Sequence, residues 1–208
     1  MKSLKNRLLN EGFYQNAGGI AHPATKADLE HEIKIRLDRG QYNLNDIDTS
    51  RITDMSYLFH NSGYDLSRLD VSEWDVSKVE DMSHMFAFCR EFNSDLSRWD
   101  VSKVEDMSSM FRGCFKFNCD LSKWNVSKVK DMYGMFAFCE NFNCDLSKWN
   151  VSNVKVTMEM FTGCTNFNCN LSKWNVKKVV NMYYMFDDSG MKEIPSWYKE
   201  PDFYNFNS

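Results

Sequence analysis

The sequence has little proline and glycine, and it contains no long apolar run. Only 3 prolines and 9 glycines occur, against 16 phenylalanines, 13 methionines and 6 tryptophans. A disordered chain has few aromatic residues, so this composition indicates a folded protein. No apolar segment approaches the roughly 20 residues of a membrane-spanning helix, and we expect no membrane span. The N-terminal segment also lacks a continuous apolar stretch, so no signal peptide is visible. We expect a cytoplasmic or virion-associated protein that reaches a cell surface only by a non-standard route.

An excess of charge of one sign is also lacking. The chain has 29 acidic and 25 basic residues, which give a net charge of −4. This balance favours binding neither to nucleic acid nor to anionic membranes. The phosphate-binding patterns G-x-G-x-x-G and G-x-x-x-x-G-K-[ST] are absent, and the four histidines form no recurring set with a nucleophile. We therefore predict that the protein is not an enzyme, needs no cofactor and binds no nucleic acid.

The seven cysteines fall into two columns that repeat every 25 residues. An odd number at regular intervals is unlike a disulfide framework, and the spacing between the columns matches no familiar zinc pattern. We expect buried free thiols that act as small apolar residues, and no metal site. The two columns are Cys89, Cys114, Cys139 and Cys164, and Cys119, Cys144 and Cys169.

The feature that dominates the sequence is a repeat of 25 residues. The segment FNCDLSKWNV occupies residues 117–126 and 142–151, and FNCNLSKWNV occupies 167–176. A degenerate copy, DTSRITDMSYLF at 48–59, precedes the others at an offset of 27 residues. A pattern that recurs at such a period indicates stacked repeats. Tryptophan marks the period at Trp74, Trp99, Trp124, Trp149 and Trp174, and a Met-Phe pair marks it at Phe86, Phe111, Phe136, Phe161 and Phe186.

Each repeat divides into two halves with different patterns. In VEDMSHMFAFC (79–89), the apolar residues follow at steps of three, three, one and three, which predicts a short helix, with Ser77 as its cap. The half FNSDLSRWDVS (92–102) predicts one or two short strands. Stacked coils would bury the tryptophans and the Met-Phe pairs as continuous ladders around a dry interior. The asparagines Asn93, Asn118, Asn143 and Asn168 are predicted to hydrogen-bond along the stack.

The flanking segments also carry signals. Thr25 and Asp28 predict the start of a helix, Leu29, Ile33 and Leu37 form its apolar stripe, and Gly40 suits its end. We divide the chain into an N-terminal tail (1–20), a helical cap (21–41), a solenoid (42–190) and a C-terminal cap and tail (191–208). The N-terminal tail is either flexible or a docking segment built on Leu4, Leu8 and Leu9.

The repeat F-N-x-D-L-S-x-W-[DN]-V-S-x-V-x-x-M-x-x-M-F-x-x-C resembles the BspA-type bacterial surface-protein repeat, which is also described from mycoplasma lipoproteins. The resemblance covers about residues 42–190. It implies an α/β repeat fold, a single leucine-rich-repeat-like solenoid of about six coils with an N-terminal helical cap. It also implies a role in adhesion or protein–protein contact, and it brings no catalytic residues. One departure, VKVTMEMF at 154–161, has Val156 in place of Asp and Thr157 in place of Met. We expect a small distortion there.

Two columns of basic residues form the candidate partner-binding face. Their acidic neighbours Asp75 and Asp100 give way to asparagine further along, so the C-terminal repeats should be more positive. The columns are either a solvated face or a site for an acidic protein or glycan surface. They consist of Arg98, Lys123, Lys148 and Lys173, and of Lys78, Lys103, Lys128 and Lys178.

The repeats predict a non-catalytic scaffold for protein–protein interaction or adhesion. The alternative is a structural component of a larger assembly, such as a phage particle, that is attached through its termini. The candidate attachment segments are residues 1–20 and the aromatic tail PDFYNFNS. The protein is accordingly expected to be a monomer or a part of a larger assembly.

Overall fold

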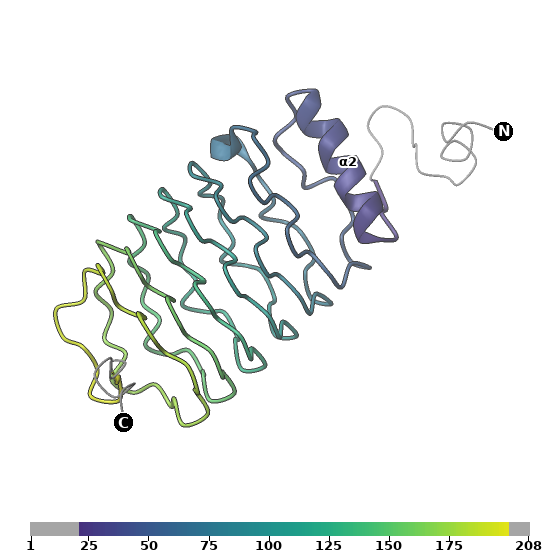
Figure 1. Cartoon of the computed structure of the whole chain (residues 1–208). Helices are drawn as coiled ribbons and strands as arrows, with labels where there is room; N and C mark the ends of the chain where they lie inside the picture. The colour runs from purple at the N-terminus through teal and green to yellow at the C-terminus, as the bar shows by residue number, and fades with distance from the viewer. Residues whose placement is uncertain (1–20, 200–208) are drawn as a thin grey trace, which may run out of the picture.

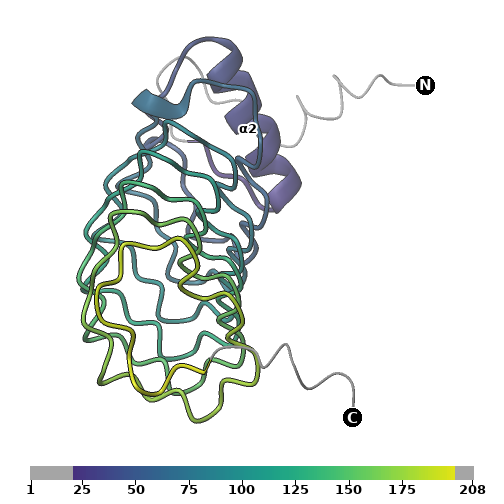
Figure 2. The same ribbon diagram turned by 60° about the vertical axis from the view of Figure 1, so that its left-hand side comes forward.

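The computed structural model describes residues 21–199. Within this range the backbone forms one α-helix, α2 (Lys26–Asp38), one 3₁₀ helix, η1 (Leu66–Arg68), and no strand. The remainder is a stack of irregular coils, with α2 lying across its N-terminal end (Figure 1). A second view shows successive coils wound about a common axis (Figure 2). The repeat organisation predicted from the sequence is confirmed.

Helix α2 begins and ends as the sequence predicts. Thr25 is its N-cap and forms a capping box with Asp28: each side chain accepts a hydrogen bond from the other residue's backbone N–H. The apolar stripe of Leu29, Ile33 and Leu37 is buried, and Gly40 follows the helix in the left-handed conformation, with φ of +72°. The helix therefore covers the first coil with apolar side chains.

Successive coils pair in parallel, but only through isolated bridges. One column of bridges runs through Asp54, Asp81, Asp106, Asp131, Val156 and Asn181. The first bridge, between Asp54 and Asp81, includes the two extra residues of the degenerate repeat. Every later bridge joins residues one regular repeat apart. Around each bridge, alternate backbone N–H groups donate to the next coil; those of Met82, His84 and Phe86 reach their acceptors at 2.8–2.9 Å.

The prediction of a short helix and short strands in each repeat is wrong. Because alternate N–H groups in 79–89 donate to the next coil, they cannot form intrahelical bonds. The intervening groups close tight turns instead: the N–H of Met85 donates to the carbonyl of Met82 at 3.2 Å. These β-turns, each closed by a bond between residues three apart, bury the same residues that a helix would. The sequence pattern therefore identified the buried residues correctly but not the conformation of their backbone. Ser77 is not a helix cap, since its N–H donates to Asp75 Oδ1 at 3.0 Å.

The corners of each coil are closed by an Asp or Asn side chain. Its Oδ1 accepts a hydrogen bond from the backbone N–H of the residue two positions further along the chain. In one repeat, Asp95, Asp100 and Asp106 accept from the backbone N–H groups of the serines at 97, 102 and 108 at 2.8–3.0 Å. Such short side chains favour turns because they bond to their own backbone. The recurring carboxylates and serines are therefore turn residues.

The aromatic residues form the predicted ladders. Centroids of successive rings in the Phe86 column are 5.7–5.9 Å apart. A second column, which begins at Phe92, stacks on the first at 4.0–4.1 Å within each coil. The indole Nε1–H of Trp124 donates to the Leu96 carbonyl of the preceding coil at 3.0 Å, which satisfies a polar group that burial would otherwise leave unpaired. Trp197 continues the tryptophan column, and its ring stacks on that of Trp174 with a centroid separation of 6.3 Å.

The cysteine and asparagine columns are both structural. All seven cysteines are free and buried, as predicted. The Cys114 thiol donates to the Phe86 carbonyl at 3.0 Å, whereas Cys144 Sγ accepts from the N–H of Leu121 at 3.1 Å. Burial raises the pKa of Cys144 to about 12, so this thiol is a poor nucleophile. The asparagine ladder is confirmed as well, since Asn118 Oδ1 accepts from the backbone N–H of the next asparagine of the column at 2.9 Å.

The expected distortion at 154–161 is absent from the backbone. The N–H of Met132 donates to the Val156 carbonyl at 3.0 Å, as in the regular coils. The substitution acts on the side chain instead. Thr157 stands in a column of buried methionines, is 1% exposed, and its hydroxyl has no hydrogen-bond partner among the described residues.

Candidate binding surfaces

The basic face consists of the two predicted columns that begin at Lys78 and Arg98. All eight side chains are exposed. Arg98 pairs with Glu73 at 3.2 Å, and Lys178 Nζ donates to Asn153 Oδ1 at 2.7 Å. Exposed pairs of this kind contribute little to stability. These residues therefore lie together on the surface and contribute little to the stability of the fold.

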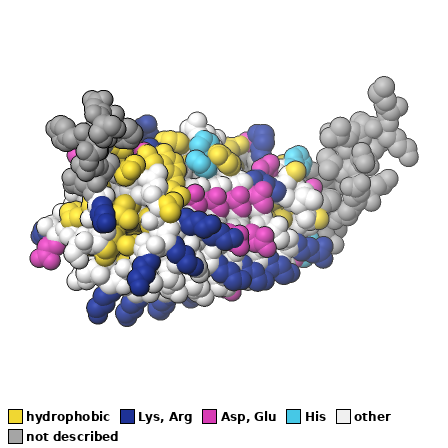
Figure 3. Space-filling view, turned by 60° about the horizontal axis from the view of Figure 1, so that its bottom comes forward, with side chains coloured by type: hydrophobic (Ala, Val, Ile, Leu, Met, Phe, Trp, Pro, Cys, Tyr) yellow, Lys and Arg dark blue, Asp and Glu magenta, His cyan; other side chains and the backbone are white. Residues whose placement is uncertain are grey.

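The charge of this face changes along the stack. The segment 73–80 carries −2, because Glu73, Asp75 and Glu80 outnumber Lys78, and the segment 98–105 is neutral. The equivalent segments 123–130, 148–155 and 173–180 carry +3, +2 and +3. Figure 3 shows rows of acidic side chains along part of this face, which end where basic and hydrophobic side chains begin. The face is acidic at its N-terminal end and basic over its C-terminal half.

A second surface is built from backbone in the left-handed conformation. Two positions of every coil have positive φ. The first column contains Tyr57, His84, Ser109, Gly134, Glu159 and Tyr184, and the second contains Asn61, Phe88, Gly113, Phe138, Gly163 and Asp188. Large side chains at positive φ are uncommon. We call this surface the aromatic face, since Tyr57, Phe88 and Phe138 are among its most exposed residues.

The N-terminal half of the aromatic face holds a cluster of four rings. Tyr57 stacks on His84 at 4.5 Å, and the His60 ring lies 5.9 Å from that of His84 and 5.7 Å from that of Phe88. His60 Nδ1 is buried and has no hydrogen-bond partner among the described residues. Burial, and next the neighbouring His60, lower the pKa of His84. The imidazole of His84 is therefore neutral at neutral pH.

Arg112 occupies the centre of the aromatic face and lies along the stack. Its guanidinium crosses Gly134, where a Cβ would stand 2.8 Å from Arg112 Nη1, and pairs with Glu159 at 2.8 Å. It also lies 5.3 Å from the centroid of the Phe138 ring and 5.9 Å from that of Tyr133. A side chain at position 134 would displace the Arg112 guanidinium from this path.

The aromatic face was not predicted from the sequence. A signal for it exists: A-F-C at 87–89 and 137–139 alternates with R-G-C at 112–114 and T-G-C at 162–164. The aromatic face thus has a period of two repeats. A search for one period of 25 residues treats these alternating residues as variation.

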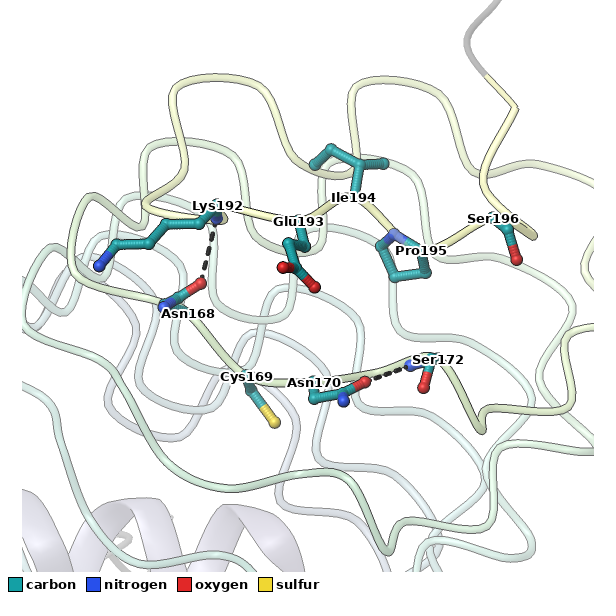
Figure 4. A pocket seen from close by; sticks show the side chains of 9 residues that line it. All are labelled: Asn168, Cys169, Asn170, Ser172, Lys192, Glu193, Ile194, Pro195 and Ser196. Atoms are coloured by element: carbon teal, nitrogen blue, oxygen red, sulfur yellow. Dashed lines mark hydrogen bonds between the residues drawn. The ribbon is translucent and has the colours of Figure 1, made fainter.

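A cleft of about 490 Å³ lies at the C-terminal end, between Asn168–Ser172 and Lys192–Ser196 (Figure 4). Asn168 Oδ1 accepts from the backbone N–H of Lys192 at 3.0 Å and so joins its two walls. Burial raises the pKa of the Cys169 thiol, and no histidine lines the cleft. Its lining residues offer polar contacts and no activated nucleophile.

Several further site predictions concern metals, membranes and the termini. Within residues 21–199, no group of three or more His, Cys, Asp or Glu side chains is arranged to hold a metal ion. No helix in the same range combines the length and apolar character needed to cross a bilayer. The predicted docking residues Leu4, Leu8 and Leu9, and the tail PDFYNFNS, lie outside the described residues.

Comparison with known proteins identifies the family of the repeats. Neither the curated proteins nor the solved structures contain a significant match to this chain. The family model described as "Mycoplasma protein of unknown function, DUF285" matches twice, over residues 35–126 and 98–197. The two overlapping matches extend from the end of α2 to Trp197 and so cover the stacked coils. The chain therefore belongs to the DUF285 family of mycoplasma proteins of unknown function.

Proposed function

We propose that the protein is a non-catalytic repeat scaffold that binds an acidic partner through the C-terminal half of its basic face. We further propose that its repeats are of the BspA type and that the stack is a leucine-rich-repeat-like solenoid. The parallel register of its coils and the buried leucine of each D-L-S motif support this assignment. A scaffold role suits a fold that presents equivalent residues at regular intervals along an extended surface.

The change of charge along the basic face is the observation that carries the proposal. Turn formation and core packing explain the other recurring polar residues, because the Asp and Asn columns close corners and the thiols are buried. Neither role requires the replacement of Asp100 by Asn125 one coil later. Lys130, which takes the place of Glu105, pairs with Glu105 itself at 2.5 Å. Equivalent charges in neighbouring coils are about 5 Å apart, within the screening length of about 8 Å at physiological salt. They therefore act together on a charged partner.

The test compares the two ends of the basic face. The triple variant Lys123→Gln, Lys148→Gln and Lys173→Gln should lose binding to heparin and to poly-glutamate, measured by affinity chromatography at increasing salt. The matched control is Lys78→Gln with Lys103→Gln, because acidic residues surround those two lysines. Equal salt elution of the two variants and the unmodified protein would refute a role for the positive half. If the triple variant does lose binding, a pull-down from the native source would identify the partner.

The second candidate function is a structural component of a larger assembly. It is favoured by the last coil, where Val176, Val179 and Met182 are only partly buried and Val180 is 83% exposed. The equivalent valines of the preceding coil, Val151 and Val154, are buried. The mass of the purified protein in solution separates the candidates, since ordered multimers favour the assembly and a monodisperse monomer favours the scaffold. Deletion of residues 1–20 should abolish those multimers if the N-terminal segment provides the attachment.

A further inference from the structure

Phe88 and Phe138 occupy positions where glycine would meet every need of the fold. Their φ angles are +64° and +62°, and the equivalent residues of the alternate coils, Gly113 and Gly163, have +71° and +69°. A side chain in this conformation is disfavoured by roughly 1–2 kcal/mol. The two rings are nevertheless 48% and 41% exposed. Strained and exposed aromatic residues that folding does not require point to a function outside the fold.

Each of these rings packs against a glycine of the next coil. A Cβ built on Gly113 would stand 3.0 Å from Phe88 Cδ1, and one built on Gly163 would stand 2.6 Å from Phe138 Cδ1. The Cδ1–Cε1 edge of each ring therefore covers a glycine. His60 lies beside the Phe88 ring at 5.7 Å and Arg112 beside the Phe138 ring at 5.3 Å, and the remaining part of each ring faces solvent. A ring held in this way is a rigid platform that loses little side-chain entropy when a ligand stacks on it.

The two platforms are regularly spaced and the surface between them is electrically balanced. Two coils separate them, a distance of roughly 10 Å at about 4.8 Å per coil. Between them, the charge of Arg112 is neutralised by Glu159 at 2.8 Å. The rings of Tyr57, His84 and Tyr133 flank the platforms, and their side chains can both donate and accept hydrogen bonds.

We propose that the aromatic face binds a neutral, extended, β-1,4-linked polysaccharide, with sugar rings stacked on Phe88 and Phe138. The electron-rich face of an aromatic ring attracts the partly positive C–H groups of a pyranose. The separation of the platforms is close to the length of one disaccharide unit in such a chain, so two equivalent sugars meet two equivalent rings. The ion pair between Arg112 and Glu159 leaves no free charge there to select an acidic ligand.

A polysaccharide fits this surface better than a protein partner does. Aromatic anchors at protein interfaces insert into pockets of the partner. Phe88 and Phe138 instead lie along their own surface, against the glycines of the next coil. A ring in this position can stack on a flat ligand but cannot act as a projecting anchor. This inference concerns a different surface from the basic face and stands independently of the function proposed above.

The proposal is tested with the full chain and soluble hexasaccharides. Binding of cellohexaose, chitohexaose and xylohexaose at millimolar concentrations is measured by isothermal titration calorimetry. The variants Phe88→Gly and Phe138→Gly introduce the residue that the same column already contains at 113 and 163, so they should fold normally. Each should weaken binding about tenfold, and the double variant about a hundredfold. The control Lys148→Gln with Lys173→Gln alters only the basic face and should bind as the unmodified protein does.

Three results would overturn the proposal. The first is an unmodified protein that binds none of the three sugars. The second is a double glycine variant that folds, as judged by circular dichroism, and still binds with unchanged affinity. The third is capture of a protein partner that depends on Phe88 and Phe138 while sugars do not compete. Salt-sensitive binding that is lost only in the lysine variant would instead assign the ligand to the basic face.

Discussion

Gly163 allows a direct test of how the Phe138 ring lies. In Gly163→Ala, the new Cβ would stand 2.6 Å from Phe138 Cδ1 and 3.5 Å from Phe138 Cα. The alanine also takes up a left-handed conformation, with φ of +69°, which costs about 1–2 kcal/mol. Displacing the ring should add about 1–3 kcal/mol, the usual range for an overpacked site. The total expected loss of unfolding free energy is about 2–5 kcal/mol.

Two comparisons separate the strain from the steric conflict. Gly63 has a similar φ of +73° and no atom within 4 Å of its added Cβ, so Gly63→Ala should show the conformational cost alone. In a Phe138→Gly background, the loss of unfolding free energy caused by Gly163→Ala should fall to the value for Gly63→Ala, because the ring that the new Cβ would meet is absent. The difference is a coupling energy of about 1–3 kcal/mol between residues 138 and 163.

The assay is urea denaturation followed by tryptophan fluorescence, since the indoles of the stack are buried. The four unfolding free energies of the double-mutant cycle give the coupling directly. A coupling near zero, or an equal cost for Gly163→Ala and Gly63→Ala, would refute the packing of the ring on the glycine. A stacking platform at Phe138 would then have no geometric basis.

Three further predictions concern the core and the turns. Thr157→Val removes a buried hydroxyl that has no hydrogen-bond partner among the described residues. It should raise the unfolding free energy by about 1–2 kcal/mol, measured as a higher melting temperature. An unchanged or lower melting temperature would contradict this prediction. The hydrogen bonds from Ser147 lower the pKa of Asp145, so its contribution to stability is complete above the unfolded carboxyl pKa and is lost as the pH falls below about 4. Asp145→Asn should lessen this acid sensitivity because Asn170 already closes the equivalent turn, and acid melting curves that match those of the unmodified protein would argue against it. Burial raises the pKa of Cys89 to about 12, and all seven thiols are buried. A thiol reagent should therefore label them only after denaturation. Rapid labelling of the native protein would show instead that the core is open to solvent.

The features that depend on one repeat contacting its neighbour were predictable from the sequence. The tryptophan, phenylalanine and asparagine columns recur at one interval, and stacking like on like is the arrangement that buries or bonds them all. The cap was predictable for a local reason, since Thr25 and Asp28 satisfy each other within four residues. The basic columns also followed from the period, which places their members on one face.

The backbone of each repeat was not predictable, because two conformations share one pattern. A helix and a series of β-turns both bury Val79, Met82 and Met85. Hydrogen bonds to the adjacent coil decide between them, and these are invisible in a single repeat. The aromatic face was missed for a related reason. Its pairing of Phe88 with Gly113 joins residues of different repeats, so neither residue carries a signal by itself.

The pairing of phenylalanine with glycine limits how a chain of this type changes in length. Adding or deleting one coil between residues 88 and 163 would set ring against ring or leave two glycines side by side. Adding or deleting two coils preserves every pair. Length variants that keep the alternation of ring and glycine should therefore differ by double units in this region, and a binding track on this side would grow by one whole platform at a time.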